Sequence, residues 1–470
     1  MSKINNIVTQ IKEGKTSAKE QVEIALQKAE EHTEHNVFLA INRVRALKRA
    51  EEIDKKHMKH EPIGRLAGVP FVAKDNFLTI GSPTTAASKI LEDFSAPFQA
   101  TAIEKLEAEG AICIGKANLD AFAHGSSTEN SAFGVTKNAI DTNRVAGGSS
   151  GGSAVAIALD IAPFALGTDT GGSIRQPASF NGVVGFKPTY GAISRYGVVA
   201  MASSTDVVGP ITQTIEDNEI ILDILSGKDN RDGTTLDDFF SISAAPKPKQ
   251  KIGLIKEFMG KDVDEDIKKA TLAYADALAA KGHVVEEVRL PMVHHSLAMY
   301  YIIVPAEISS NLARYDGIRY GKRAKNAKSL AEVYGQSRSQ GFMPENIRRI
   351  MIGSYVLSSG YFDAYYQQAQ KARTILIKEM NDLFDEYDVL IGPTTPAPAF
   401  LIGENSKDPV KMYLSDMMTV FASLSGAPAL SVPAGTTKDG LPIGVQLVGQ
   451  NKTDANILSL AKSIEVSRHE

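Results

Sequence analysis

The spacing of apolar residues predicts helices at both ends of the chain. Apolar residues recur at helical spacing over 4–11, and Ser17 followed by Glu20 forms a capping box before a second apolar stripe. We therefore expect residues 1–60 to form an N-terminal helical segment. A last helical pattern covers 454–466.

From residue 61 onward, short apolar runs alternate with helical patterns. Strand-like runs occupy 69–73, 111–114, 164–166, 252–255, 284–288, 389–391 and 445–448. Helical patterns over 101–109 and 264–281 each end at a glycine, a common helix terminator. This alternation predicts an α/β protein with a mostly parallel sheet and helices on its faces. We expect one domain over 61–470, with a surface excursion near 227–251 and a helical region near 295–387.

Composition indicates a globular protein. The 470 residues include 51 Lys and Arg against 55 Asp and Glu, a formal net charge of −4, and 43% are hydrophobic. These values exclude a disordered chain and a basic protein that coats nucleic acid. The apolar stretches are too short to cross a bilayer and no signal-peptide core precedes them, so we expect no membrane association.

The chain has a single cysteine, Cys113, and therefore cannot form an intramolecular disulfide. No Cys-x-x-Cys pair is present to bind zinc, so we expect no metal site and a cytoplasmic setting. Cys113 lies in a strand-like run, which is typical of a core residue rather than a nucleophile.

Glycine, serine and threonine concentrate in two runs. Residues 147–153 read Gly-Gly-Ser-Ser-Gly-Gly-Ser, and 167–173 read Gly-Thr-Asp-Thr-Gly-Gly-Ser. One such run alone is most often a flexible turn, but two runs separated by one αβ-sized segment favour a site where backbone N–H groups face a ligand. Serine stands where a phosphate-binding loop requires lysine. A single Asp-Thr-Gly triplet at 169–171 does not supply the paired carboxylates of an aspartic protease.

Two kinds of serine activation stay open from the residues alone. Gly148-x-Ser150-x-Gly152 matches the nucleophile elbow of α/β-hydrolases, which needs a histidine further along the chain. The available histidines, none in a motif-like setting, are His283, His294, His295 and His469. A neutral lysine can also activate serine, and Lys74 follows the run 69–73, where parallel sheets form sites. Its spacing alone favours a solvated lysine or one paired with Asp75.

Several motifs together resemble the amidase signature family. They are Gly-Val-Pro-Phe-Val-Ala-Lys-Asp-Asn at 68–76, the run 147–153, Gly-Thr-Asp-Thr-Gly-Gly-Ser-Ile-Arg-Gln-Pro-Ala at 167–178, and Gly-Phe-Lys-Pro-Thr at 185–189. Lys74, Ser149 and Ser173 follow in the family's order. The resemblance implies an α/β amidase signature fold: a large mixed, mostly parallel central β-sheet covered by helices on both faces.

The resemblance also implies a Ser–cis-Ser–Lys triad. Ser173 would be the nucleophile, Ser149 the bridging hydroxyl after a cis peptide bond, and Lys74 the buried base. Glycines beside the nucleophile allow backbone N–H groups to converge on an oxyanion, and the matching residues are Thr170, Gly171 and Gly172. Asp169 and Arg175 are expected to brace this loop.

Within the family, the C-terminal half resembles the A subunits of amidotransferases that act on Glu-tRNA(Gln) or Asp-tRNA(Asn). The matching segments are 309–321, 348–366 and 408–433. The resemblance assigns Arg349 to the α-carboxylate of glutamine, Asp416 to its α-ammonium and Tyr300 to the pocket wall. A zwitterion does need one fixed cation and one fixed anion. By residue type alone, the three are a solvated arginine, a surface acid and a packed tyrosine.

Two positions depart from the pattern of these amidotransferase chains, which usually read Asp-Glu-Phe-Ala-Met-Gly where this chain has Asp-Ala-Phe-Ala-His-Gly at 120–125. His124 replaces the methionine that borders the glutamine pocket. Such a histidine adds a titrating group to the pocket. We expect a hydrogen-bonded, substrate-binding wall residue rather than a catalytic one.

The resemblance implies a glutamine amidohydrolase subunit that forms a γ-glutamyl ester on Ser173. Its ammonia would pass to a partner B subunit, where ATP and Mg²⁺ serve the amidation of the charged tRNA, and a small C subunit would complete a heterotrimer. No cofactor is expected in this chain, which has no phosphate-binding loop and is mildly acidic. Two alternatives are a stand-alone amidase for a small amide and a non-catalytic scaffold subunit; the intact Lys74 and serines argue against the scaffold.

Overall fold

A single mixed β-sheet runs through the molecule. The computed structural model describes residues 2–237, 240, 247–405 and 408–465, and within them 11 strands pair in the order β1-β3-β2-β4-β6-β5-β10-β11-β9-β7-β8. The strands are β1 (Phe38–Ile41), β2 (Pro70–Lys74), β3 (Ile112–Ala117), β4 (Phe164–Asp169), β5 (Val184–Lys187), β6 (Val207–Thr212), β7 (Lys251–Ile255), β8 (Val284–Val288), β9 (Val389–Pro393), β10 (Ala429–Thr436) and β11 (Pro442–Gly449).

The direction of the strands corrects one expectation. The sheet is large and mixed, as implied, but it is not mostly parallel. Among the described strands, only β2–β3, β2–β4, β7–β8 and β7–β9 pair in parallel, and the other six neighbouring pairs are antiparallel. Strands β10 and β11 are separated by only 437–441, too short for the crossover that parallel neighbours need.

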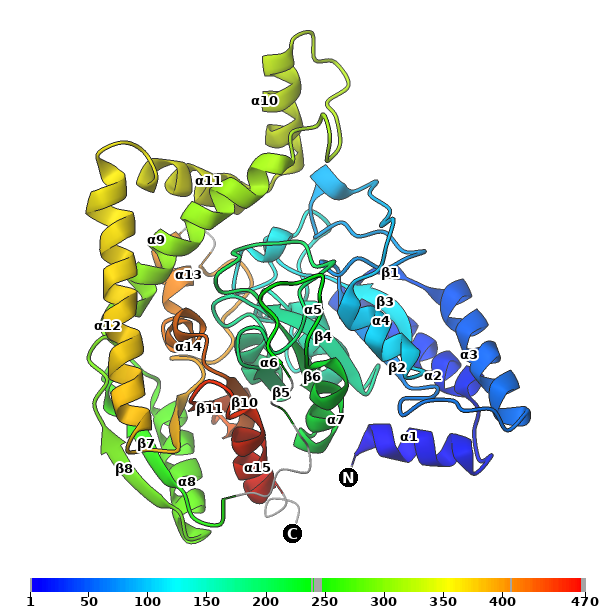
Figure 1. Cartoon of the computed structure of the whole chain (residues 1–470), viewed down its shortest axis with the longest axis horizontal. Helices are drawn as coiled ribbons and strands as arrows, with labels where there is room; N and C mark the ends of the chain where they lie inside the picture. Colours follow the sequence, from blue (N-terminus) through cyan, green and yellow to red (C-terminus); the bar gives the residue numbers. More distant parts are fainter. Residues whose placement is uncertain (1, 238–239, 241–246, 406–407, 466–470) are drawn as a thin grey trace.

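Helices cover both faces of this sheet (Figure 1). The α-helices are α1 (Lys3–Lys12), α2 (Ala18–Glu31), α3 (Arg43–Met58), α4 (Thr101–Ala108), α5 (Gly151–Ala158), α6 (Arg175–Asn181), α7 (Ile215–Leu225), α8 (Glu265–Ala280), α9 (Val293–Asn311), α10 (Leu330–Gly341), α11 (Pro344–Val356), α12 (Gln367–Phe384), α13 (Pro409–Leu414), α14 (Val420–Ser425) and α15 (Asp454–Glu465). Short turns of 3-10 helix are η1 (Thr33–His35), η2 (Lys89–Leu91), η3 (Ala121–Ala123), η4 (Lys256–Met259) and η5 (Leu312–Arg314), and η6 (Phe362–Tyr366) is a π-helix.

The first 60 residues contain three helices and also a strand. Ser17 caps α2 by accepting the Glu20 N–H, as the capping box predicts. Strand β1 pairs antiparallel with β3, so this segment extends the central sheet. Strand β1 was not predicted, because it is short and only partly buried and lacks the apolar run that marks the central strands.

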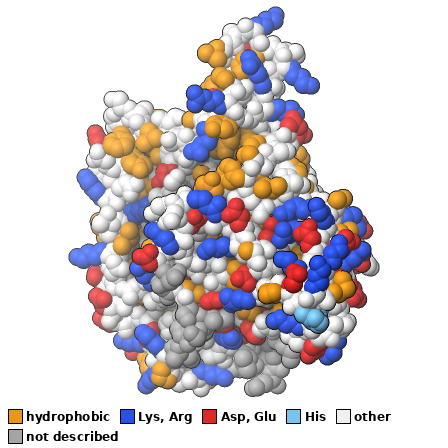
Figure 2. All heavy atoms as spheres, turned by 45° about the vertical axis from the view of Figure 1, so that its right-hand side comes forward, with side chains coloured by type: hydrophobic (Ala, Val, Ile, Leu, Met, Phe, Trp, Pro, Cys, Tyr) orange, Lys and Arg blue, Asp and Glu red, His pale blue; other side chains and the backbone are white. Residues whose placement is uncertain are grey.

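The predicted helical region near 295–387 contains α9, α10, α11 and α12. In Figure 1, α10 and the loop before it project from the rest of the molecule. Figure 2 shows basic and acidic side chains interspersed over much of one face. Between α7 and β7, the described residues of the expected excursion form neither helix nor strand. Within the described ranges, every helix is too short or too polar to span a membrane.

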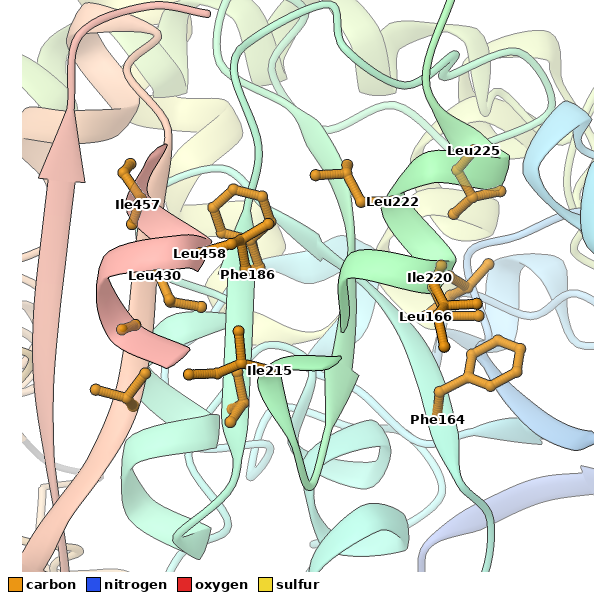
Figure 3. Packing of buried hydrophobic residues seen from close by; sticks show 14 of the residues in the cluster. Phe164, Leu166, Phe186, Ile215, Ile220, Leu222, Leu225, Leu430, Ile457 and Leu458 are labelled. Atoms are coloured by element: carbon orange, nitrogen blue, oxygen red, sulfur yellow. The ribbon is translucent and has the colours of Figure 1, made fainter. Parts of the chain in front are cut away.

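The sheet is buried on both faces, and successive strand residues pack into hydrophobic clusters on opposite sides of it. In β2, Phe71 and Ala73 pack into a cluster with residues of α4, α7 and α15, whereas Val72 packs on the opposite side with residues of α2, α3 and α5. Figure 3 shows the first cluster, where Leu222 of α7 and Leu458 of α15 lie over the sheet. Cys113 is fully buried in this cluster, as expected, and burial raises the pKa of its thiol to about 11.

Candidate active site

Strand β2 delivers Lys74 to the carboxyl edge of its parallel neighbours β3 and β4. The side chain is fully buried, and Nζ lies 2.8 Å from Ser149 Oγ, 2.9 Å from Ser150 Oγ and 2.9 Å from Thr168 Oγ1. Both Gly/Ser/Thr runs therefore meet at this amine. Asp75 does not pair with Lys74; its carboxylate lies 2.8 Å from Lys116 Nζ.

Burial controls the protonation of Lys74. Desolvation of the ammonium lowers the pKa of Lys74 to about 7, against the opposing effect of the carboxyl groups of Asp120 and Asp169. A substantial fraction of the amine is then unprotonated near neutral pH. An unprotonated amine beside a serine hydroxyl can accept a proton from it.

Ser149 immediately precedes Ser150 and helix α5, at a tightly packed turn. The Gly148–Ser149 peptide bond is cis, as the resemblance implied. The Asp120 backbone N–H donates to the Ser149 carbonyl over 3.3 Å. A Cβ atom on Gly148 would lie 2.1 Å from Asp120 Oδ2, so only glycine fits there. Burial raises the pKa of Asp120 to about 7, and its carboxyl group accepts two backbone N–H bonds.

The loop from β4 to α6 carries Ser173, which is 8% exposed. The Ser150 backbone N–H donates to the Ser173 carbonyl over 3.1 Å, which joins the two runs directly. Asp169 and Arg175 brace the loop as expected: both are fully buried, with Arg175 Nη2 3.0 Å from Asp169 Oδ1. Burial alone would raise the pKa of Asp169, but the Arg175 guanidinium outweighs it and the pKa is lowered.

The three residues predicted for an oxyanion site are held firmly. The Gly172 N–H donates to Asp169 Oδ1 over 2.8 Å, so this group stabilises the loop itself. Thr419 Oγ1 donates to the Gly171 carbonyl over 2.5 Å, and Thr170 Oγ1 is 2.7 Å from a carboxyl oxygen of Asp206.

Tyr300 of α9 lies directly against this loop. A Cβ atom on Gly171 would be 2.6 Å from Tyr300 Cζ and 2.7 Å from its hydroxyl oxygen. The tyrosine is 3% exposed, so it closes one side of the Ser173 loop. The expected role of Tyr300 as a wall of the glutamine pocket stays a prediction.

A cavity of about 270 Å³ adjoins this region. His124, Arg349, Tyr413 and Asp120 are among its lining residues, whereas Lys74 and Ser173 are not. Arg349 of α11 is 3% exposed, which excludes a solvated position on the helix face. Its guanidinium lies over the Tyr413 ring, 5.6 Å from the centroid, and makes a cation–π contact with it.

Arg349 is connected to Asp416 through aromatic residues. Arg349 Nε donates to Glu345 Oε1 over 2.8 Å, and the guanidinium lies 5.2 Å from the centroid of the Tyr301 ring. The Tyr301 hydroxyl donates to Asp416 Oδ2 over 3.3 Å. Asp416 is 8% exposed, and burial raises its pKa to about 7 despite the opposing charge of Arg349. The predicted cation and anion thus belong to one buried polar group.

His124 is fully buried and lines the same cavity. Asn346 Nδ2 lies 2.7 Å from His124 Nδ1, so an amide N–H can donate to this nitrogen and leave the ring proton on Nε2. Nε2 has no hydrogen-bond partner among the described residues. Burial, together with the charge of Arg349, holds the pKa of His124 well below its usual value, so the ring is neutral.

The histidines considered for a hydrolase triad have other environments. His283 Nδ1 accepts the Gln250 N–H over 3.2 Å, and His294 and His295 are exposed at the start of α9. His469 lies outside the described residues.

Sequence reasoning missed several residues that the structure places at the site. They are Thr168, Tyr301, Glu345, Asn346 and Tyr413. Thr168 lies within a run already singled out, and Tyr301 is adjacent to a predicted site residue. The other three carried no local signal, since each reaches the site only through packing of α11 and α13.

The sequence profile of the amidase family matches residues 20–458. The chain belongs to the amidase family. It is 49% identical over 432 residues to the A subunit of glutamyl-tRNA(Gln) amidotransferase from Geobacillus thermodenitrificans, covering 91% of this chain and 89% of that protein.

Solved structures of amidase-family proteins share the fold. The crystal structure of the A subunit of glutamyl-tRNA(Gln) amidotransferase from Thermotoga maritima is similar with a TM-score of 0.78 and 39% identity, covering 95% of this chain and 91% of that one. A bacterial aryl acylamidase of the amidase signature family is similar with a TM-score of 0.86 and 27% identity, covering 98% and 95%.

Proposed function

We propose that this chain is the glutamine-hydrolysing subunit of a tRNA-dependent amidotransferase. The observation that carries the catalytic part is the buried Lys74 amine, 2.8 Å from Ser149 Oγ at the junction of the two Gly/Ser/Thr runs. The names of the similar proteins support the amidotransferase assignment. The buried Arg349 and Asp416 support an amino-acid substrate.

In the proposed reaction, Ser173 Oγ attacks the side-chain amide carbon of glutamine. Its proton passes through the Ser149 hydroxyl to the neutral Lys74 amine. The negative charge on the carbonyl oxygen is stabilised by backbone N–H groups of the 170–173 loop; one such donor is worth roughly 3 kcal/mol. Because the Gly172 N–H already donates to Asp169, the proposal gives this role mainly to Thr170 and Gly171.

Collapse of this intermediate breaks the carbon–nitrogen bond. The proton held by Lys74 returns through Ser149 to the departing nitrogen, which leaves as ammonia. A water molecule then hydrolyses the γ-glutamyl ester, delivers its proton along the same route, and releases glutamate. The bound proton is thus recovered, and the triad residues return to their starting state.

In the proposed substrate complex, Arg349 pairs with the α-carboxylate and Asp416 with the α-ammonium. Tyr300 and His124 form the walls around the bound molecule. A zwitterion needs one fixed cation and one fixed anion to hold it. A simple amide has neither an α-carboxylate nor an α-ammonium, so Arg349 and Asp416 would not favour its binding.

We further propose that the released ammonia is used at a B subunit, where ATP and Mg²⁺ serve amidation of the charged tRNA. A C subunit would complete the heterotrimer, and the assembly would work in the cytoplasm. These assignments extend the family resemblance and the names of the similar proteins.

Ammonia release from glutamine tests the catalytic proposal. Ser173→Ala is expected to reduce the rate of the assembled complex at least ~1,000-fold, whereas Ser354→Ala, at an exposed serine of α11, leaves it unchanged. Wild-type release by Ser173→Ala would refute the nucleophile assignment. A wild-type complex without glutaminase activity, in which an active-site serine probe fails to label Ser173, would instead favour a scaffold.

A stand-alone amidase is the second candidate, favoured by the close structural match to an aryl acylamidase. Arg349→Ala distinguishes the two. A glutaminase loses kcat/KM for glutamine by about 100-fold or more when a buried charge partner of the substrate is removed, while hydrolysis of a simple uncharged amide is little changed. Fast hydrolysis of simple amides by the isolated chain, with glutamine ignored, would favour the second candidate.

A further inference from the structure

Residues 314–340, which include most of α10, form a projection that we call the basic arm (Figure 1). This segment has seven Arg and Lys residues and two acidic residues, a net charge of +5, although the whole chain has a net charge of −4. In Figure 2, Lys and Arg side chains are spread over the projection at the top of the view. This protruding feature therefore carries a local excess of positive charge.

The base of the basic arm contains a recess of about 480 Å³. Its lining includes Lys322, Arg323 and Lys325 from the arm and Lys89 from η2, with amide side chains of Asn326 and Gln336. One acid, Glu92, also lines the recess, where its carboxylate accepts from Lys322 Nζ over 2.8 Å. Arg323 and Lys325 are exposed. Convergent cations and amide donors of this kind suit a phosphate group.

Aromatic side chains lie beside these cations. Tyr320 is 56% exposed and Tyr334 is 44% exposed, and the Arg338 guanidinium lies 4.9 Å from the centroid of the Tyr334 ring. Exposed aromatic rings interleaved with basic residues provide flat surfaces for base stacking next to phosphate contacts. An acidic protein surface could form ion pairs with the cations, but it has no flat bases to stack on the exposed tyrosine rings.

We propose that the basic arm binds RNA, with a backbone phosphate seated in the recess and bases against the exposed tyrosines. The inference deepens the proposed function, on which it rests for the identity of the RNA: it gives this chain its own contact with tRNA, separate from the glutamine site. It does not require the arm to read sequence, because phosphate contacts position an RNA without selecting bases.

Helix α3 provides a control surface. Lys55, Lys56 and Lys59 at its end are exposed, as are the arm residues, but they follow the acidic residues of 51–54. Reversing three lysines there changes the net charge as much as reversing three cations on the arm. A comparison of the two variants separates the arm from the overall charge of the protein.

The experiment measures binding of the full-length chain to unfractionated tRNA by filter retention between about 50 and 200 mM salt. Arg323→Glu, Lys325→Glu and Lys328→Glu together are expected to weaken binding at least tenfold and to reduce the salt dependence of log affinity by about 3, since three phosphate contacts are lost. Lys55→Glu, Lys56→Glu and Lys59→Glu together are expected to change affinity less than twofold.

Unchanged tRNA binding by the arm variant, or an equal loss in the control variant, would overturn the proposal. If the charge-reversal variant has an altered circular dichroism spectrum, Arg323, Lys325 and Lys328 are replaced by glutamine instead. The affinity for tRNA is then expected to fall at least threefold. Tyr320→Ala tests stacking and is expected to weaken binding severalfold without changing the salt dependence. Glutaminase activity is measured on the same samples: its absence from the wild type, with tRNA bound through the arm, would refute the proposed function alone.

Discussion

Replacement of Lys74 by methionine should increase the stability of the protein at neutral pH while it abolishes the proposed activity. The lysine is fully buried, and its pKa falls from 10.5 to about 7 on folding. At pH 7 the unfolded lysine is fully protonated and the folded lysine about half protonated, so folding costs about 4 kcal/mol for this group. Methionine has a similar length and carries no such cost.

Lost hydrogen bonds offset part of this gain. The Lys74 amine contacts the hydroxyls of Ser149, Ser150 and Thr168. At about 1 kcal/mol each, their loss amounts to about 3 kcal/mol at every pH. The expected net effect of Lys74→Met at pH 7 is a stabilisation of about 1 kcal/mol.

The sign of the effect changes with pH. Between about pH 8 and 10 the unfolded lysine keeps most of its proton while the folded lysine is neutral, so the free energy of unfolding of the wild type rises by up to about 1.4 kcal/mol per pH unit relative to the variant. The two proteins should be equally stable near pH ~8.5, and at pH ~10 the wild type should be the more stable by about 2 kcal/mol.

Urea denaturation followed by circular dichroism measures both proteins from pH 6.5 to 10, a suitable probe because the chain has no tryptophan. Lys55→Met, at an exposed lysine, controls for removal of a lysine that water solvates in both states. A stability difference between Lys74→Met and wild type that stays constant over this range would refute a neutral buried lysine, and with it the proposed base.

Three further predictions concern the same site. Because the same lysine must be neutral to accept a proton, kcat/KM for glutamine should rise about tenfold per pH unit below about 7 and level off above it, as measured by ammonia release from pH 5.5 to 8.5; a flat profile would contradict this. Asp169→Asn leaves the buried guanidinium of Arg175 without its carboxylate and should lower the free energy of unfolding by about 3–5 kcal/mol in urea, so a loss under 1 kcal/mol would be evidence against the brace. Gly171→Ala places a Cβ atom 2.6 Å from Tyr300 Cζ and should reduce kcat about 100-fold, whereas Gly233→Ala, with open space around it, should have wild-type kinetics.

Much of the secondary structure follows from the sequence alone. Helix α4 ends just before Gly110, and β2, β3 and β4 form where apolar runs occur, because periodicity and helix termination depend on a few neighbouring residues. The two runs around Ser149 and Ser173 were also identifiable, since their glycine content is a local property. The resemblance to a family then singled out Lys74 among the possible bases.

The tertiary structure decided what local pattern leaves open. Strand direction depends on how distant segments pair, which is why a mostly parallel sheet was predicted and a mixed sheet with mainly antiparallel neighbours is found. Asn346 and Tyr413 reach the site only because α11 and α13 pack over it.

The chemistry of the site depends most strongly on tertiary structure. A lysine at the end of a strand is ordinarily a solvated cation, and nothing in the residues around Lys74 indicates otherwise. Its proton affinity falls only because residues 75 to 94 positions away along the chain enclose it and exclude water. The sequence by itself determined which groups are present; burial determined that one of them can act as a base.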